Sequence, residues 1–292
     1  MADQSAAWAI IKPAGTDYLD ASDELIRDNW DAIEEFARGE TINLVITRPT
    51  AATVRVYADR LVLLKDDGAA AALPPAFIVT SVDVTIDITA AGANGLDAGA
   101  EGASDWYTIW VIRDTTNSLT RGLLSITFDV ATGPTMPANY TYRRLVGAVY
   151  NDASSNFVNF TQRGKRVQYA ASQQILTNGI SDAAWAALVS LAAFVPDRFA
   201  ADKPMASRMF GYADIDSLTA ATGLTLEFAA DASGNYRGTK LTHYASGAAW
   251  INGGHFEQEL LAASPMSFSY RTTDTAGLIR ANAYLQGYEI EI

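Results

Sequence analysis

The feature that most constrains the fold is a hydrophobic period of two that begins after Gly39 and recurs towards the end of the chain. Residues 82–89 alternate Val or Ile with Asp or Thr. Successive side chains of a strand point to opposite faces, so this segment predicts a strand with one buried and one solvated face. Residues 53–57 and 124–130 alternate in the same way, whereas residues 106–112 are apolar on both faces, as in a central strand.

Turn residues separate these segments, for example Asp66-Asp67-Gly68, Asn94-Gly95 and Gly133-Pro134. Short strands at this spacing, with no helical pattern between them, are typical of antiparallel sandwiches and barrels. The 292 residues suffice for two domains at ~150 residues each. We therefore predict a mostly β protein with two antiparallel β-sandwich, jelly-roll-like domains in tandem, preceded by an N-terminal arm and one α-helix.

The expected boundaries follow from changes in the pattern. We expect the arm and helix over residues 1–39, a first sandwich over 40–163, a linker over 164–180 and a second sandwich over 181–292. Residues 185–195 fit either a helix or a strand that runs into Pro196. Each sandwich contains a strand in which glycine, Gly147 or Gly287, lies between apolar and aromatic residues, and Gly287 indicates a bulge or a close approach of two backbones.

The predicted helix lies between a capping residue, Asp20 or Ser22, and Gly39, which ends it. Its apolar residues recur at steps of three and four and form one stripe: Ile26, Trp30, Ile33 and Phe36. An apolar stripe of this kind must be buried against another surface. Two interpretations stay open: the helix packs on its own first domain, or it forms an attachment and oligomer interface with copies of itself or with a partner protein.

The sequence offers no constellation for catalysis, cofactor binding or metal binding. Cysteine is absent, and His243 and His255 have no partner at ligand spacing. The carboxylate pair Asp214 and Asp216 has the spacing of a solvated strand face, although acid–base work or calcium binding are the sharper alternatives. We therefore expect a protein that is not an enzyme and that holds neither cofactor nor metal.

Charge and hydropathy exclude two further classes of partner. The formal net charge of -12 disfavours a surface that follows phosphates, so we expect no nucleic-acid partner. The longest apolar stretch, residues 183–195, is too short for a transmembrane helix, and the N-terminus lacks the features of a signal peptide. We therefore expect no membrane insertion and no secretion by that route.

Aromatic residues are abundant, and most occupy inward strand positions. Tyr236, Tyr244 and Trp250 instead lie close together in a turn-rich part of the second unit. Exposed aromatic rings can stack on sugars or pack at a subunit interface. These three residues are therefore the candidates for a glycan or subunit contact.

Several short motifs of the chain resemble a module of tailed-bacteriophage virion proteins. The motifs are Gly92-Ala93-Asn94-Gly95-Leu96-Asp97, residues 106–112, Gly122-Leu123-Leu124-Ser125, and residues 136–149 with the turn Met136-Pro137-Ala138-Asn139-Tyr140 before a strand containing Arg144 and Gly147. Asn139 stands where glycine is common in that family. Residues 194–196 and 287–289 are similar to the sandwich that often follows, which favours a strand over residues 185–195. Residues 13–17 and 26–30 look like N-terminal attachment segments of tail-associated proteins.

The resemblance implies a structural component of a tailed-phage virion, made in the host cytoplasm: a tail-fibre, hinge or adaptor subunit attached through its N-terminal helix. Its implied partners are other virion proteins of tail, neck or capsid and copies of itself, with a homotrimer as the expected assembly. Two alternatives stay open. One is a receptor- or glycan-binding module of the tail that contacts the host surface, and the other is a capsid decoration or head-fibre protein.

Overall fold

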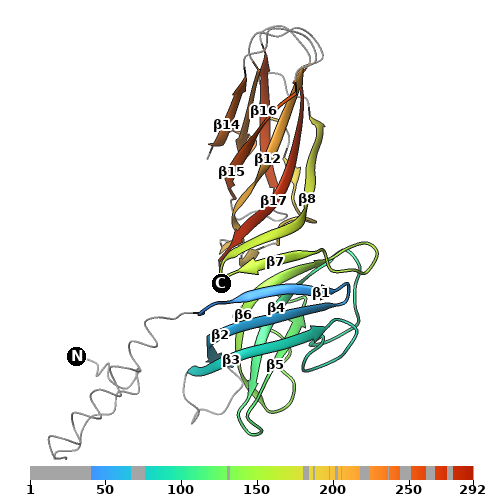
Figure 1. Ribbon diagram of the computed structural model, residues 1–292, viewed down its shortest axis with the longest axis vertical. Coiled ribbons are helices and arrows are strands. Elements are labelled where there is room, and N and C mark those ends of the chain that lie inside the picture. Colours follow the sequence, from blue (N-terminus) through green and yellow to red (C-terminus); the bar gives the residue numbers. More distant parts are fainter. Residues whose placement is uncertain are drawn as a thin grey trace, which may run out of the picture.

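Figure 1 shows the computed structural model of the chain, in which strands are the regular secondary structure of the described residues. The described residues are 41–66, 76–129, 132–179, 184–186, 188–196, 198–200, 203–204, 206–217, 224–235, 237–243, 251–260, 267–274 and 279–291. Within these ranges all strand pairs are antiparallel and no helix occurs, which confirms the prediction of a mostly β, antiparallel protein. The helix predicted within residues 1–39 lies outside the described residues.

The lower group of strands in Figure 1 comprises β1 (Val45–Thr50), β2 (Thr53–Lys65), β3 (Ala76–Asp87), β4 (Asp105–Asp114), β5 (Leu119–Ser125) and β6 (Tyr140–Asn151). Strands β1, β2 and β3 lie across β4, β5 and β6, as in orthogonally packed layers. The end of β2 makes the corner between the layers, because Leu64 pairs with Arg143 of β6.

The upper group contains two sheets. One face is formed by β8 (Arg166–Gly179), β17 (Ile279–Ile290), β12 (Ala206–Ser217) and β15 (Ile251–Glu259). The other is a four-stranded sheet of β14 (Arg237–His243), β13 (Leu224–Ala229), β16 (Ser267–Asp274) and β9 (Val189–Ser190). A small pair, β10 (Arg198–Ala200) and β11 (Lys203–Pro204), forms a sheet of its own.

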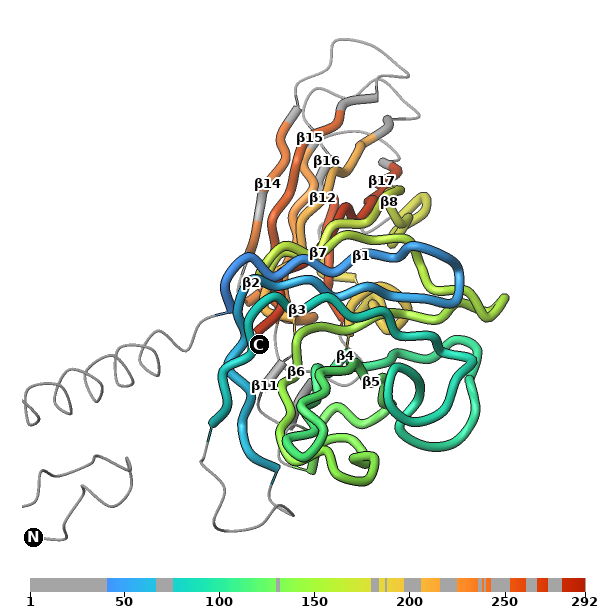
Figure 2. The backbone as a smooth tube through the Cα atoms, turned by 60° about the horizontal axis from the view of Figure 1, so that its bottom comes forward, coloured from blue at the N-terminus to red at the C-terminus, as the bar shows by residue number. Residues whose placement is uncertain are grey.

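One sheet runs through both groups. Strand β7 (Phe160–Arg163) pairs with β1 on one side and with β8 on the other, and β8 then pairs with β17. Both views place β7 and β1 side by side where the upper strands meet the lower group (Figures 1 and 2). The 11-stranded sheet therefore passes through residues 166–179, most of the stretch expected to be a linker.

The alternation in the sequence identifies β3 correctly and misjudges the end of β5. In β3, Val82 and Ile86 are buried while Asp83 and Thr85 are exposed, as predicted. The strand predicted over residues 124–130 is wrong for residues 126–129, because β5 ends at Ser125, and residue 130 lies outside the described residues. Ile126 is 66% exposed, so no described strand covers its side chain, which a two-residue period cannot reveal. Among residues 185–195, the described part contains β9 and a tight turn, and no helix.

Glycines stand at equivalent irregularities in β6 and β17. Pairing with β4 shifts between Ile109 and Trp110 opposite Gly147, and pairing with β12 shifts opposite Gly287. A Cβ on Gly287 would overlap the Val167 carbonyl oxygen and lie 2.6 Å from Phe210 Cζ. The bulge and close approach predicted at Gly287 are therefore confirmed.

A five-residue turn also occurs in both groups. Residues 152–156 read Asp-Ala-Ser-Ser-Asn, and residues 231–235 read Asp-Ala-Ser-Gly-Asn. In each turn the aspartate carboxylate accepts backbone N–H groups from the third and fifth residues, at 2.8 to 3.0 Å. The fourth residue has a positive φ, 56° at Ser155 and 76° at Gly234. Such side-chain caps stabilise tight turns locally.

Candidate functional site

The site residues expected from the sequence lie outside the part of the chain that the structure describes. The attachment stripe of Ile26, Trp30, Ile33 and Phe36 falls within residues 1–40, and the aromatic candidates Tyr236, Tyr244 and Trp250 fall in two later gaps. Both sets stay predictions. The described residues do present two other features with functional potential, which are an aromatic joint between the strand groups and an exposed tyrosine on β2.

In the described strands, the ionisable side chains either lie apart from one another or are held by hydrogen bonds and ion pairs. Asp214 is half-buried and its Oδ1 accepts a hydrogen bond from Asn282 Nδ2 at 2.8 Å, while His255 is exposed on the neighbouring β15. No group of three or more His, Cys, Asp or Glu side chains able to hold a metal ion occurs among the described residues. The same residues include no helix long and apolar enough to cross a membrane.

Glu227 is a buried carboxylate whose partners hold it ionised. Its oxygens lie 2.5 Å from Arg271 Nη2 and 3.1 Å from Lys240 Nζ, on the two strands flanking β13. Burial raises the pKa of Glu227, but the hydrogen bonds from Lys240 and Arg271 outweigh it, so the pKa is lowered from its ordinary value. The Arg271 guanidinium also lies 4.9 Å from the Trp185 ring centroid. This arrangement stabilises the sheet and leaves Glu227 unsuited to donate a proton.

The aromatic joint fixes the upper group of strands to the lower group. Trp106 on β4 donates its indole N–H to the carbonyl oxygen of Ala192 at 2.7 Å. Tyr169 on β8 donates its hydroxyl to the carbonyl oxygen of Phe194 at 2.5 Å. Both acceptors belong to one turn, in which Phe194 and Val195 donate backbone hydrogen bonds to Leu191. Two aromatic side chains on different strands thus hold the same short turn.

Tyr288 of β17 completes the joint. Its ring centroid lies 6.0 Å from Tyr169 and 6.3 Å from Trp106, within the range of favourable aromatic pairs. Tyr288 and Tyr169 are buried, and the buried apolar residues form one cluster that continues from the lower to the upper group. Burial raises the pKa of Tyr169 and of Tyr288 well above the usual range, so both hydroxyls stay neutral. The joint is suited to hold two bodies rigidly and not to perform chemistry.

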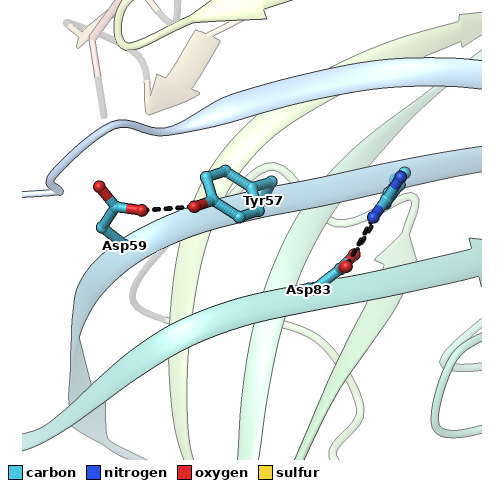
Figure 3. Close-up of polar contacts among 4 residues, drawn as sticks. Tyr57, Asp59 and Asp83 are labelled. Carbon is cyan, nitrogen blue, oxygen red and sulfur yellow. Dashed lines mark hydrogen bonds and ion pairs between the residues drawn. The ribbon is translucent and has the colours of Figure 1, made fainter.

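The second feature, the tyrosine surface, is the exposed side of β2 and β3 formed by Arg55, Tyr57, Asp59 and Asp83, together with Asn43. The Tyr57 hydroxyl donates to Asp59 Oδ1 at 2.5 Å, and Arg55 binds both Asp83 oxygens at 2.6 and 2.7 Å (Figure 3). Asn43 Nδ2 donates to the second oxygen of Asp59 at 2.6 Å. Alternation along β2 directs these side chains to the solvated face.

Hydrogen bonds dominate the electrostatics of the tyrosine surface. Those from Tyr57 and Asn43 lower the pKa of Asp59, and the one from Arg55 lowers the pKa of Asp83. The bond to Asp59 raises the pKa of Tyr57. At neutral pH both carboxylates are therefore ionised and Tyr57 is protonated, so the contacts in Figure 3 persist as drawn.

The motifs that resemble virion proteins occupy structural positions. Asn94 exchanges two hydrogen bonds with the backbone of Gly122, at 2.7 and 2.9 Å, so the segment around it covers the free edge of β5. Asn139 has a φ of 72°, a conformation that glycine adopts most readily and that asparagine tolerates. Asparagine at this position therefore keeps the turn in a conformation that most other residues disfavour.

Sequence reasoning missed both features. The hydrogen bonds of the joint link residues 86 and 25 positions apart, and no local pattern encodes them. The sequence does contain a signal for the tyrosine surface. In an alternating strand, the aromatic Tyr57 occupies a position on the polar face, between Arg55 and Asp59 on that face. A comparison with models of known protein families finds no match, and a search of curated protein sequences finds none either.

Proposed function

We propose that this chain is a structural subunit of a tailed-phage virion, acting as a tail-fibre, hinge or adaptor protein and not as an enzyme. The observation that carries the proposal is the joint: Tyr169 holds the turn that follows β9 in the upper group, Trp106 of the lower group donates to the same turn, and the two groups already share a sheet. A subunit that transmits force or holds a spacing needs this rigidity. The resemblance of the Gly92–Asp97 and Met136–Val149 segments to virion proteins supports the same conclusion.

At a finer level, we propose that the two groups of strands are tandem jelly-roll-like sandwiches that meet at the pair of β7 and β8, with β8 in place of the linker expected over residues 164–180. Attachment is assigned to the stripe of Ile26, Trp30, Ile33 and Phe36 in the N-terminal segment, which would contact other virion proteins or the same helix of other copies. A homotrimer is the expected assembly, since closed cyclic symmetry is the common way to repeat one interface.

The test of the proposal combines mass measurement with localisation in particles. Multi-angle light scattering of the full chain should give a trimer mass, and antibody-labelled or reconstructed particles should contain the chain. Ile33→Ser, which hardly changes helix propensity, should abolish assembly or incorporation, whereas Glu34→Ser, which lowers helix propensity but removes no apolar side chain of the stripe, should not. A monomer that is absent from particles, or equal incorporation of both variants, would contradict the proposal.

A further inference from the structure

The ring of Tyr57 lies along β2 and does not stand away from it. Its hydroxyl reaches Asp59, two residues further along the same strand, and residues at that separation are ~6.6 Å apart. This is close to the full reach of a tyrosine side chain, so the ring extends parallel to the strand (Figure 3). The residue is 42% exposed, consistent with one ring face turned to solvent.

The ring is held in this position before any ligand arrives. Asp59 accepts the Tyr57 hydroxyl with one carboxylate oxygen and the Asn43 amide with the other, so the acceptor is itself fixed. Asn43 has a φ of 53°, which places it at an irregularity at the start of β1 next to Asp59. A preorganised aromatic face binds with less loss of conformational entropy than a free one.

Unused hydrogen-bonding capacity lies at both ends of the ring. Arg55 donates Nε and Nη2 to Asp83, which leaves the other guanidinium hydrogens for a ligand. The carboxylates of Asp59 and Asp83 each accept two hydrogen bonds and have lone pairs left. The tyrosine surface therefore offers one apolar face bordered by donors and acceptors.

From this arrangement we propose that the tyrosine surface is a saccharide-binding platform for an uncharged pyranose ring. A pyranose has an apolar face of C–H groups and a rim of hydroxyls that both donate and accept hydrogen bonds. The C–H face would stack on Tyr57, and the hydroxyls would bond to Arg55 and Asp83 at one end and to Asp59 at the other. This binding role is independent of where the chain sits in a virion.

Other occupants fit the surface less well. Carboxylates on both sides of Tyr57 and a net charge of -12 disfavour phosphates and acidic sugars. A protein interface needs an apolar core several residues wide, but the neighbours of Tyr57 on the same face are polar or partly covered: Thr47, Thr85, Arg163 and Val45. A single ring among polar groups matches a sugar better.

The experiment is a glycan array probed with the full chain, followed by titration of the best neutral glycan. We expect neutral hexose-containing glycans to bind in preference to sialylated or uronic-acid glycans. Tyr57→Ala should weaken binding about tenfold or more, as expected for the loss of a stacking ring. Tyr57→Phe, which keeps the ring but releases it from Asp59, should weaken it several-fold. Leu119→Ala, at a residue on β5 with similar exposure (38%), should bind as the parent does.

Melting curves identify variants that fail to fold. If Tyr57→Ala does not fold, Tyr57→Phe still tests the proposal, because it removes only one exposed oxygen. Three results would overturn the proposal. They are the absence of neutral glycan binding by the folded parent, a preference for anionic glycans, and binding that is unaffected by both Tyr57 variants. A surface that captures only another protein would likewise reject it. None of these outcomes bears on assembly, which the Ile33 and Glu34 variants test separately.

Discussion

Replacing Tyr169 by Phe should make the stability of the protein respond differently to alkaline pH. The substitution keeps the ring against Tyr288 and removes one hydroxyl, which donates to the Phe194 carbonyl at 2.5 Å. At pH 8 the loss of this bond leaves a partly buried carbonyl without its partner. The variant should therefore be about 1–2 kcal/mol less stable than the parent.

The difference should shrink above pH 10. A tyrosine in the unfolded chain ionises near pH 10, whereas burial raises the pKa of folded Tyr169 far above that value. The stability contributed by a raised pKa is complete below the unfolded pKa and is lost as the pH rises beyond it, because only the unfolded state can release the proton. At pH 11 the parent thus loses about 1.4 kcal/mol through Tyr169, and the Phe variant does not. The gap between the two proteins should then nearly close.

The assay is urea unfolding of both proteins at pH 8, 9, 10 and 11, followed by tryptophan fluorescence. Because the parent and the variant share every other tyrosine, their difference isolates Tyr169. A stability gap that stays constant from pH 8 to pH 11 would refute the reasoning, since it would mean that Tyr169 ionises equally in the folded and unfolded states. A variant as stable as the parent at pH 8 would show that the bond to Phe194 contributes nothing.

Three further pairs of substitutions test the turns and bulges of the fold, each by thermal or urea unfolding. Gly287→Ala should cost about 3 kcal/mol because its Cβ would overlap a backbone carbonyl, whereas Gly99→Ala, with no atom within 4 Å and a φ of 77°, should cost about 1 kcal/mol. Asn139→Gly should be nearly neutral and Asn139→Val clearly destabilising, because the φ of 72° disfavours a branched side chain. Ser155→Gly should be tolerated, but Gly234→Ser should not, since a Cβ there would overlap the Trp185 indole.

The sequence predicted what depends on local periodicity and turn chemistry. The alternation of residues 82–89 was sufficient to place Val82 and Ile86 inside and Asp83 outside, because burial along a strand depends on parity alone. The pattern failed at Ile126, where alternation continues after the pairing strand has ended. Periodicity reports which side of a strand is apolar, and it does not report whether a second layer reaches that far.

The aromatic joint could not be predicted from the sequence for a different reason. Trp106 and Tyr288 are typical core residues by pattern, and nothing in their neighbourhood indicates that they meet the turn at Ala192. That contact depends on how β4 and β17 are brought together through the shared sheet, which is a property of the whole topology. The candidate site was therefore harder to predict than the fold.

A glycine at a register shift occurs in both groups of strands. Both groups therefore accommodate a strand bulge in the same way. Gly147 and Gly287 each lie opposite a register shift, and a Cβ at either would strike a side chain packed behind it, Ile46 Cδ1 at 2.8 Å or Phe210 Cζ at 2.6 Å. A bulge increases strand twist, and glycine lets the neighbouring side chain fill the concave side. In β17 this bulge lies next to Tyr288, whose ring centroid is 6.3 Å from that of Trp106 and 6.0 Å from that of Tyr169. The joint therefore lies next to a bulge that requires glycine, since a Cβ on Gly287 would overlap the Val167 carbonyl oxygen.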